Sequence, residues 1–143
     1  MPRKYECPGF LSGVISQQTY EKWLHRKAQA HYRRDKKRGN STSTCAEYKM
    51  AIHQAVIDSQ GRDAYTHEPL DWHLLSTYDN TQAKEGGRDY KRQFASLPSV
   101  DHVGDGTGPA NFKICSWKTN DSKSDMTMEE YVSLCKKIIE FNG

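Results

Sequence analysis

Apolar side chains recur at three- and four-residue spacing in three stretches of the chain, and this spacing predicts three main helices. The first helix begins after Ser16, a residue type that favours helix N-caps, and runs to about Arg38. Thr44 caps the second helix, which runs from Cys45 to about Ser59 and places Tyr48, Ile52, Ala55 and Val56 on one face.

The third helix opens with Thr127 and Glu130, which have the spacing of a capping box, and it runs to about Phe141. Its apolar residues share one face, which we expect to pack on the core: Tyr131, Leu134, Cys135, Ile138 and Ile139. The second half of the first helix is nearly all polar, so we expect it to project into solvent or along a ligand.

Shorter patterns between the second and third helices predict a small sheet. Pro98 precedes a strand-like triplet at 99–101, and residues 111–117 alternate well enough to form a second strand. Glycines within 103–109 predict a loop between the strands, and short helices are expected at 72–78 and 120–124. The fold class is therefore α+β, in one domain with a helical N-terminal part at 16–60, a small core at 61–125 and a C-terminal helix at 126–143.

Charge changes the interpretation of the first helix. Eight of the 21 Lys and Arg residues lie between positions 22 and 38, opposed only by Asp35, so this stretch carries +7 and the rest of the chain −4 within a net charge of +3. A cationic element on a mildly acidic body favours a polyanion such as DNA as partner, although a charged helix face can also be merely solvated. The candidate nucleic-acid contacts are Lys22, Arg26, Lys27, Arg33, Arg34, Lys36, Lys37 and Arg38.

Composition narrows the class of protein further. Mean hydropathy is −0.93, and no apolar run approaches the ~20 residues of a membrane span. The first ten residues lack the apolar stretch of a secretory signal, so we expect a cytoplasmic protein without a membrane partner. The four cysteines form no Cys-x-x-Cys pair, so no structural zinc is expected and the thiols are interpreted as reduced.

The candidate chemistry lies between positions 100 and 123. Asp101 and His102 end the first predicted strand, Asn111 follows the glycine loop, and Asn120 and Lys123 form an Asn-x-x-Lys sequence at the predicted short helix. This order resembles the ββα-metal nucleases of the HNH endonuclease family. The stretch Ala64-Tyr65-Thr66-His67-Glu68-Pro69-Leu70 resembles the turn that often precedes the family's motif, although His67 stands where the family often has glycine. The likeness covers roughly residues 61–125.

The resemblance implies a small ββα-metal core embedded in several helices and an endonuclease that hydrolyses DNA phosphodiesters with Mg²⁺, Mn²⁺ or another divalent cation. Asp101 and Asn120 would supply hard oxygen ligands, and neutral His102 would act as general base. Because neighbouring residues on a strand point to opposite faces, Asp101 and His102 can serve one site only if the backbone bends there. The resemblance further implies that Asn111 fixes the hairpin loop and orients His102, and that Lys123 positions phosphate or stabilises the site.

The sequence departs from the family in its structural zinc site. Members often carry two Cys-x-x-Cys pairs around the hairpin, but here Ser116 and Thr119 occupy the positions of the second pair and no first pair exists near Tyr65. We expect a packed core to replace the zinc, built from Trp72, Phe94 and Trp117.

Several alternatives stay open at this point. Asp101 and His102 could be a strand-end pair with only a turn hydrogen bond, which would leave a non-catalytic DNA-binding module. An HNH-type nuclease could also act on RNA or on structured nucleic acid, and a secreted nuclease toxin is disfavoured because no export segment is visible. A single ββα unit makes one nick, so double-strand cleavage would need a homodimer or two visits.

Overall fold

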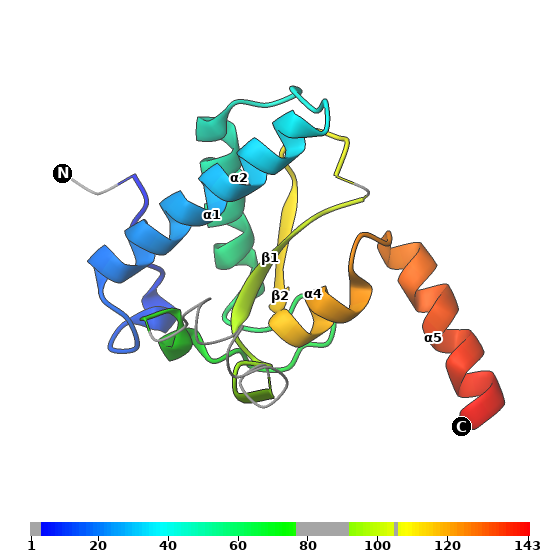
Figure 1. The fold of residues 1–143 in the computed structure, drawn as a ribbon. Helices are drawn as coiled ribbons and strands as arrows, with labels where there is room; N and C mark the ends of the chain where they lie inside the picture. Colours follow the sequence, from blue (N-terminus) through cyan, green and yellow to red (C-terminus); the bar gives the residue numbers. More distant parts are fainter. Residues whose placement is uncertain (1–3, 77–91, 105) are drawn as a thin grey trace.

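A computed structural model describes residues 4–76, 92–104 and 106–143 (Figure 1). Helices and a two-stranded antiparallel sheet combine in a small α+β fold, as the sequence predicts. The expected loop at 79–89 and the end of the short helix at Tyr78 lie outside the described residues. In chain order the elements are η1 (Gly9–Leu11), α1 (Gln17–Lys37), α2 (Cys45–Ser59), η2 (Trp72–Ser76), β1 (Pro98–His102), β2 (Phe112–Ser116), α4 (Trp117–Lys123) and α5 (Met128–Asn142).

Helices α1 and α2 begin where their capping residues predict. The Ser16 hydroxyl accepts a hydrogen bond from the Thr19 amide at 3.0 Å. Thr44 and Glu47 form a reciprocal capping box, with distances of 3.1 Å and 2.9 Å. Helix α2 ends at Ser59, and the chain leaves it through Gln60 and Gly61, whose φ values of +52° and +86° lie in the left-handed region that favours glycine.

The two long helices pack against each other and form most of the hydrophobic core with the sheet. Helix α1 is also buried much further along than the sequence suggests. Ala28, His31 and Asp35 are all buried, so the expectation that its second half projects into solvent is wrong, and the alternative that it lies along a ligand stays a prediction. The side of this half of the helix that carries the cationic side chains is exposed to solvent.

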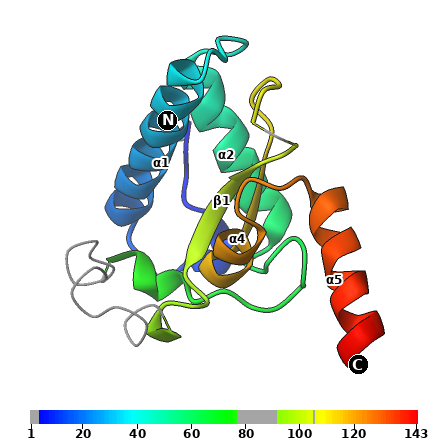
Figure 2. The same cartoon turned by 45° about the vertical axis from the view of Figure 1, so that its right-hand side comes forward.

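Strands β1 and β2 pair from Pro98 opposite Ser116 to His102 opposite Phe112. Helix α2 packs on β2, whereas α4 packs on both strands and lies on a different side of the hairpin from the α1–α2 pair (Figure 2). Helix α4 starts at Trp117, earlier than predicted, because the Ser116 hydroxyl caps it by accepting from the Thr119 amide at 3.0 Å. The order along the chain is therefore β1, β2 and α4, and α4 begins directly after the last residue of β2.

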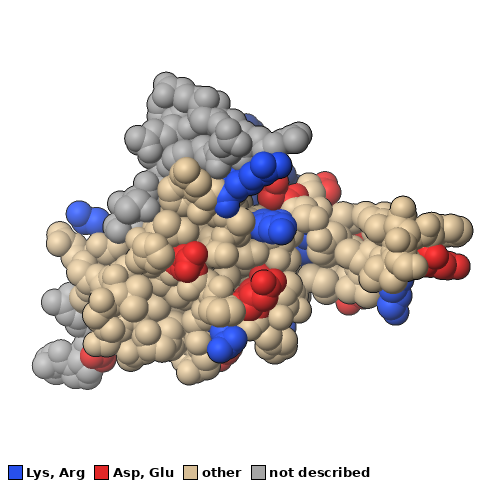
Figure 3. Space-filling view, turned by 90° about the horizontal axis from the view of Figure 1, so that it is seen from below, with Lys and Arg blue, Asp and Glu red and all other residues tan. Residues whose placement is uncertain are grey.

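Helix α5 has the predicted capping box at Thr127 and Glu130, but the prediction that it packs on the core is wrong. None of its residues is buried, and Ile139 and Phe141 are 66 % and 80 % exposed. The helix leads away from the body in Figure 1, and in Figure 3 it forms an arm with mostly uncharged side chains on the face in view. The pattern identified an amphipathic helix but not the surface that its apolar face contacts.

Within the described ranges, none of the helices combines the length and the apolar character that crossing a membrane requires.

Candidate functional site

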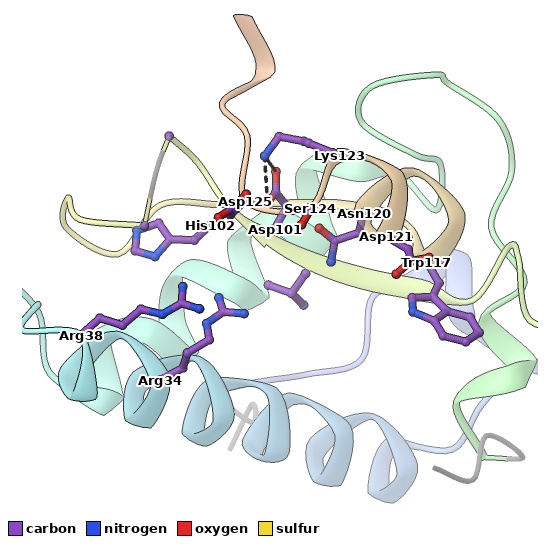
Figure 4. Close-up of a pocket in the computed structure, with 13 residues that line it drawn as sticks. Arg34, Arg38, Asp101, His102, Trp117, Asn120, Asp121, Lys123, Ser124 and Asp125 are labelled. Carbon is purple, nitrogen blue, oxygen red and sulfur yellow. Dashed lines mark hydrogen bonds and ion pairs between the residues drawn. The ribbon is translucent and has the colours of Figure 1, made fainter. Parts of the chain in front are cut away.

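A cavity of about 310 Å³ lies between one face of α1 and the end of the hairpin with α4 (Figure 4). We call it the site cavity. Side chains from three parts of the chain line it and supply the chemistry considered below: Arg34, Arg38, Asp101, His102, Asn120 and Lys123. Four of the five residues of the sequence motif therefore border one cavity, and two cations of α1 face them.

Strand β1 continues through His102 without the bend that the sequence analysis required. Asp101 and His102 consequently follow the ordinary alternation of a strand and join separate groups of partners. Asp101 contacts the turn at Tyr65 and helix α4, whereas His102 contacts α1 and the loop after β1. The prediction of a bend was wrong, and both residues reach the cavity because they stand at the end of the strand.

His102 is 4 % exposed and has an acceptor at each ring nitrogen. Its Nδ1 lies 2.7 Å from Oδ2 of Asp35, and its Nε2 lies 3.0 Å from the carbonyl oxygen of Pro109. Both contacts are satisfied together only when each nitrogen carries a proton. The ring is thus held rigidly by a carboxylate from α1 and by the backbone of the glycine loop.

Asp35 stands out in the sequence only as the lone acid in a cationic stretch, yet it is 1 % exposed and central to this region. Its Oδ2 also accepts a hydrogen bond from the Tyr48 hydroxyl at 2.8 Å, and burial followed by this bond raises the pKa of Tyr48. Its Oδ1 is buried without a hydrogen bond and lies 3.6 Å from Nε of Arg34. The one sequence signal that could have identified Asp35 is its position as the lone acidic residue in a run of cations.

Arg34 is held at the cavity by His31. The Nη2 atom of Arg34 lies 2.8 Å from Nδ1 of His31, which is buried against the ring of Phe112. Burial, with the neighbouring Arg34 and Lys27 charges, lowers the pKa of His31 to about 3. His31 is therefore neutral at pH 7 and able to accept this hydrogen bond.

Asp101 has its own set of partners on the opposite side of β1. The Tyr65 hydroxyl donates to Oδ2 at 2.6 Å, and Nζ of Lys123 lies 3.3 Å from the same oxygen and 3.4 Å from Oδ1. Burial first, and the Asp101 carboxylate next, raise the pKa of Tyr65. Lys123 is 2 % exposed, so its ammonium forms a buried ion pair with this carboxylate, drawn as dashed lines in Figure 4.

Asn120 lies within α4 rather than at its N-cap, and its amide nitrogen donates to the Ser99 hydroxyl at 2.9 Å. Its side chain points toward the cavity in Figure 4. Among described residues, no cluster of three or more His, Cys, Asp or Glu side chains has the arrangement of a metal site. The cavity does offer hard oxygen donors in Asp101 and Asn120, a set that fits a cation such as Mg²⁺, which keeps most of its waters and needs few protein ligands.

The structure does not place every expected residue at the cavity. Asn111 is exposed and is not among the residues lining it, and its backbone carbonyl accepts from the amide of Val103 at 2.8 Å. The contacts that orient His102 come from Asp35 and Pro109, so the role expected for Asn111 belongs to other groups. Of the eight cations predicted to bind nucleic acid, seven in α1 and Arg38 at its C-cap, only Arg34 and Arg38 line the site cavity.

A second residue that the sequence analysis missed is Asp63, which is buried before the turn at Tyr65. Its Oδ1 accepts from the amide of Tyr65 at 2.8 Å, and its Oδ2 accepts from the Ser116 amide and the Thr119 hydroxyl, each at 2.9 Å. Burial by itself raises the pKa of Asp63, but these hydrogen bonds outweigh it and lower the pKa. The carboxylate thus ties the turn to the junction between β2 and α4.

The turn itself forms despite His67. This residue adopts a φ of +64°, the left-handed region in which glycine is most at ease. Its amide donates to the Asp63 carbonyl at 2.8 Å, and its carbonyl accepts from the Arg62 guanidinium at 2.9 Å. Local hydrogen bonds therefore maintain a tight turn without the glycine.

The comparisons with known proteins assign no family to this fold and site: no protein-family model matches the chain, and neither the curated proteins nor the solved structures contain a significant match.

Proposed function

We propose that this chain is an endonuclease that hydrolyses phosphodiester bonds in DNA with a divalent cation, and that β1, β2 and α4 form a ββα-metal unit of the HNH type. One observation carries the proposal: Asp101, His102, Asn120 and Lys123 border one cavity that two arginines of α1 also face. Carboxylate and amide oxygens can hold a divalent cation, an imidazole can accept the proton of water, and an ammonium can stabilise charge on phosphate, which are the roles in metal-assisted phosphodiester hydrolysis.

The cation would be held by Asp101 and Asn120, since both bring oxygen atoms to the cavity. When bound, a divalent cation polarises the phosphate and makes its own water more acidic. The Lys123 ammonium already neutralises Asp101 in this structure, so Lys123 can either remain near the carboxylate or move its charge onto a phosphate oxygen. Arg34 and Arg38 would meet the phosphates on the opposite wall.

His102 would accept the proton of the attacking water. To do so, Nε2 has to leave its present acceptor and release its own proton to solvent before it faces the attacking water, because a nitrogen that carries a proton cannot take a second one. Pro109 belongs to the loop in which Gly104 and Gly106 adopt φ values of +88° and +85°. A shift of this loop would free Nε2 while Asp35 continues to hold Nδ1.

The same hydrogen bonds favour one alternative, a DNA-binding module without catalysis. An imidazole that is 4 % exposed and bonded at both nitrogens is also what a purely structural histidine looks like. In that case the arginines of α1 would bind DNA and the wild-type protein would cleave nothing.

A plasmid assay separates the two functions. Supercoiled DNA is incubated with purified protein and Mg²⁺, Mn²⁺ or EDTA, and single-stranded DNA and RNA are tested in parallel. We expect cation-dependent nicking, which His102→Ala reduces by about 10²- to 10⁴-fold, the usual contribution of a general base. DNA binding, measured without a divalent cation, should be retained by this variant.

The matched control is His25→Ala, because His25 is an exposed histidine of α1 outside the site cavity. It should cleave at the wild-type rate. Wild-type protein that binds DNA but yields no product with any cation would establish the binding module instead. Cleavage of RNA but not of DNA would support the proposed hydrolysis of phosphodiester bonds and would assign RNA as the substrate.

A further inference from the structure

A second cavity, of about 360 Å³, lies beside the site cavity along α1. Trp117 and Asn120 line both cavities, so the two lie next to each other along α1, and together we call them the groove. One wall is α1, and the other is formed by β1, α4 and neighbouring residues such as Leu97. We call this second part the side cavity. Its volume lies within the ~300–1,000 Å³ of small-ligand sites.

The side cavity is cationic. Arg26 and Lys27 line it, and none of the described residues that line it is Asp or Glu. Neither cation has an ion pair in the described part of the chain. Burial, and then the adjacent Arg26 charge, lower the pKa of Lys27, as expected of a cation that has no counter-ion nearby. Such a site favours an anion.

The spacing of the basic residues connects the two cavities. Arg26, Ala30 and Arg34 are each four residues apart, so they lie along one inclined row of α1, which Arg38 extends at the C-cap. Arg26 and Arg34 are eight residues apart, or about 12 Å along a helix. That distance covers roughly three steps of a B-form DNA strand at 3.4 Å per step.

We propose that the groove holds one DNA strand and that the side cavity seats a nucleotide flanking the scissile phosphodiester, with Arg26 and Lys27 bound to its phosphate. This assignment rests on the proposed function for the identity of the ligand. Trp23, Leu75 and Trp117 give the cavity apolar surface against which a sugar or base can lie. Its described lining residues include Arg26 and Lys27 and no acid, whereas Asp101, Asp121 and Asp125 line the site cavity.

The proposal divides the cations of α1 into two groups. Arg26, Lys27, Arg34 and Arg38 line the groove, whereas Lys22, Arg33, Lys36 and Lys37 line neither of its cavities. The charge of the whole stretch suggested eight equivalent contacts. The groove instead predicts that position on the helix, rather than charge alone, determines how strongly each cation binds DNA.

The experiment measures binding without cleavage. A fluorescein-labelled ten-residue deoxythymidine oligonucleotide is titrated with full-length protein in EDTA at several salt concentrations, and anisotropy gives the affinity. Arg26→Ala/Lys27→Ala should bind about tenfold more weakly at low salt. Its slope of log affinity against log salt should be smaller by about 0.7 for each phosphate that the variant no longer neutralises.

Two variants with the same loss of charge serve as comparisons. Lys136→Ala/Lys137→Ala removes two exposed cations of α5 and should bind within twofold of wild type. Lys22→Ala/Arg33→Ala removes two cations of α1 that lie outside the groove and should lose at most about threefold, through the general field alone. Equal losses of DNA affinity in the Arg26/Lys27 and Lys22/Arg33 variants would contradict the proposal that the groove binds DNA.

The groove and the proposed catalysis fail in different ways. Position-dependent binding by a protein that never cleaves would support the groove and refute the nuclease. Cation-dependent cleavage by a protein whose two α1 variants bind alike would support the nuclease and refute the side cavity. Thermal melting of each variant shows whether a loss of binding comes from unfolding, and a milder substitution, Lys27→Gln, replaces any variant that melts early.

Discussion

The two faces of β1 differ in where their supporting residues come from. On the His102 face, the imidazole is held by Asp35, 67 positions earlier in the chain, and Tyr48 of α2 binds the same carboxylate. On the Asp101 face, the carboxylate is held by Tyr65 and Lys123, 36 and 22 positions away. One face thus depends on the N-terminal helices and the other on the turn and α4.

This difference shows that residues adjacent in a motif need not share a local environment. Asp101 and His102 are neighbours in sequence, yet none of the groups that hold one of them holds the other. If the two networks are separate, damage to one should leave the other intact. Double mutants should then show additive losses of stability, within about 0.5 kcal/mol.

The largest effect is expected on the Asp101 face. Asp101→Ala leaves the Lys123 ammonium buried without a counter-charge, which should cost about 3–5 kcal/mol of unfolding free energy in urea titrations. Lys123→Met in the same background should recover much of the loss, because the unpaired charge is gone. A cost below about 1 kcal/mol for Asp101→Ala, the range of exposed ion pairs, would mean that Lys123 reaches solvent and that this face is not a closed network.

The His102 face should be the less sensitive of the two. Asp35→Ala removes the acceptor of two buried donors, the Tyr48 hydroxyl and Nδ1 of His102, which should cost about 1–3 kcal/mol in all, with each donor at the low end of the range for an unsatisfied group. Loss of the buried and unsatisfied Oδ1 offsets part of this cost. Urea titration of Asp35→Ala alone and combined with Asp101→Ala measures both the loss and the coupling. A coupling energy above about 1 kcal/mol between the two substitutions would show that the two faces form one network.

The smallest effect is a pH dependence that belongs to the His102 side through His31. Because its pKa falls from 6.5 to about 3 on folding, the unfolded chain binds a proton between these values that the native chain does not. Stability should therefore decline as pH falls below 6.5, by at most about 1.4 kcal/mol per pH unit from this group. His31→Gln should flatten the decline of the melting temperature between about pH 6.5 and 5. If the melting temperature of the variant declines as steeply as that of the wild type, the pH dependence belongs to other groups. One such group is His53, whose pKa is also lowered by burial.

Local signals in the sequence predicted most of the elements but few of their tertiary contacts. Ser16, Thr44 and Thr127 each marked a helix start correctly, because a cap is a property of a few consecutive residues. The four motif residues at the site cavity were also recognisable from spacing. Asp35 and Asp63 were not, since a buried carboxylate is identified by distant partners that no local pattern contains. The apolar face of α5 was visible, but its exposure depends on the arrangement of the whole chain.

The hydrogen bonds of Asp63 have a consequence for how the protein meets its surroundings. They join the turn at Tyr65 to the segment with Ser116 and Thr119, the two positions at which the HNH resemblance would put thiolate ligands of a structural zinc. A clasp made of a carboxylate, amides and a hydroxyl does not compete with chelators for an ion and cannot be oxidised as paired thiols can. The junction between the turn and the hairpin therefore needs neither a metal ion nor a thiol to hold it, so chelators and oxidants should leave this junction in place.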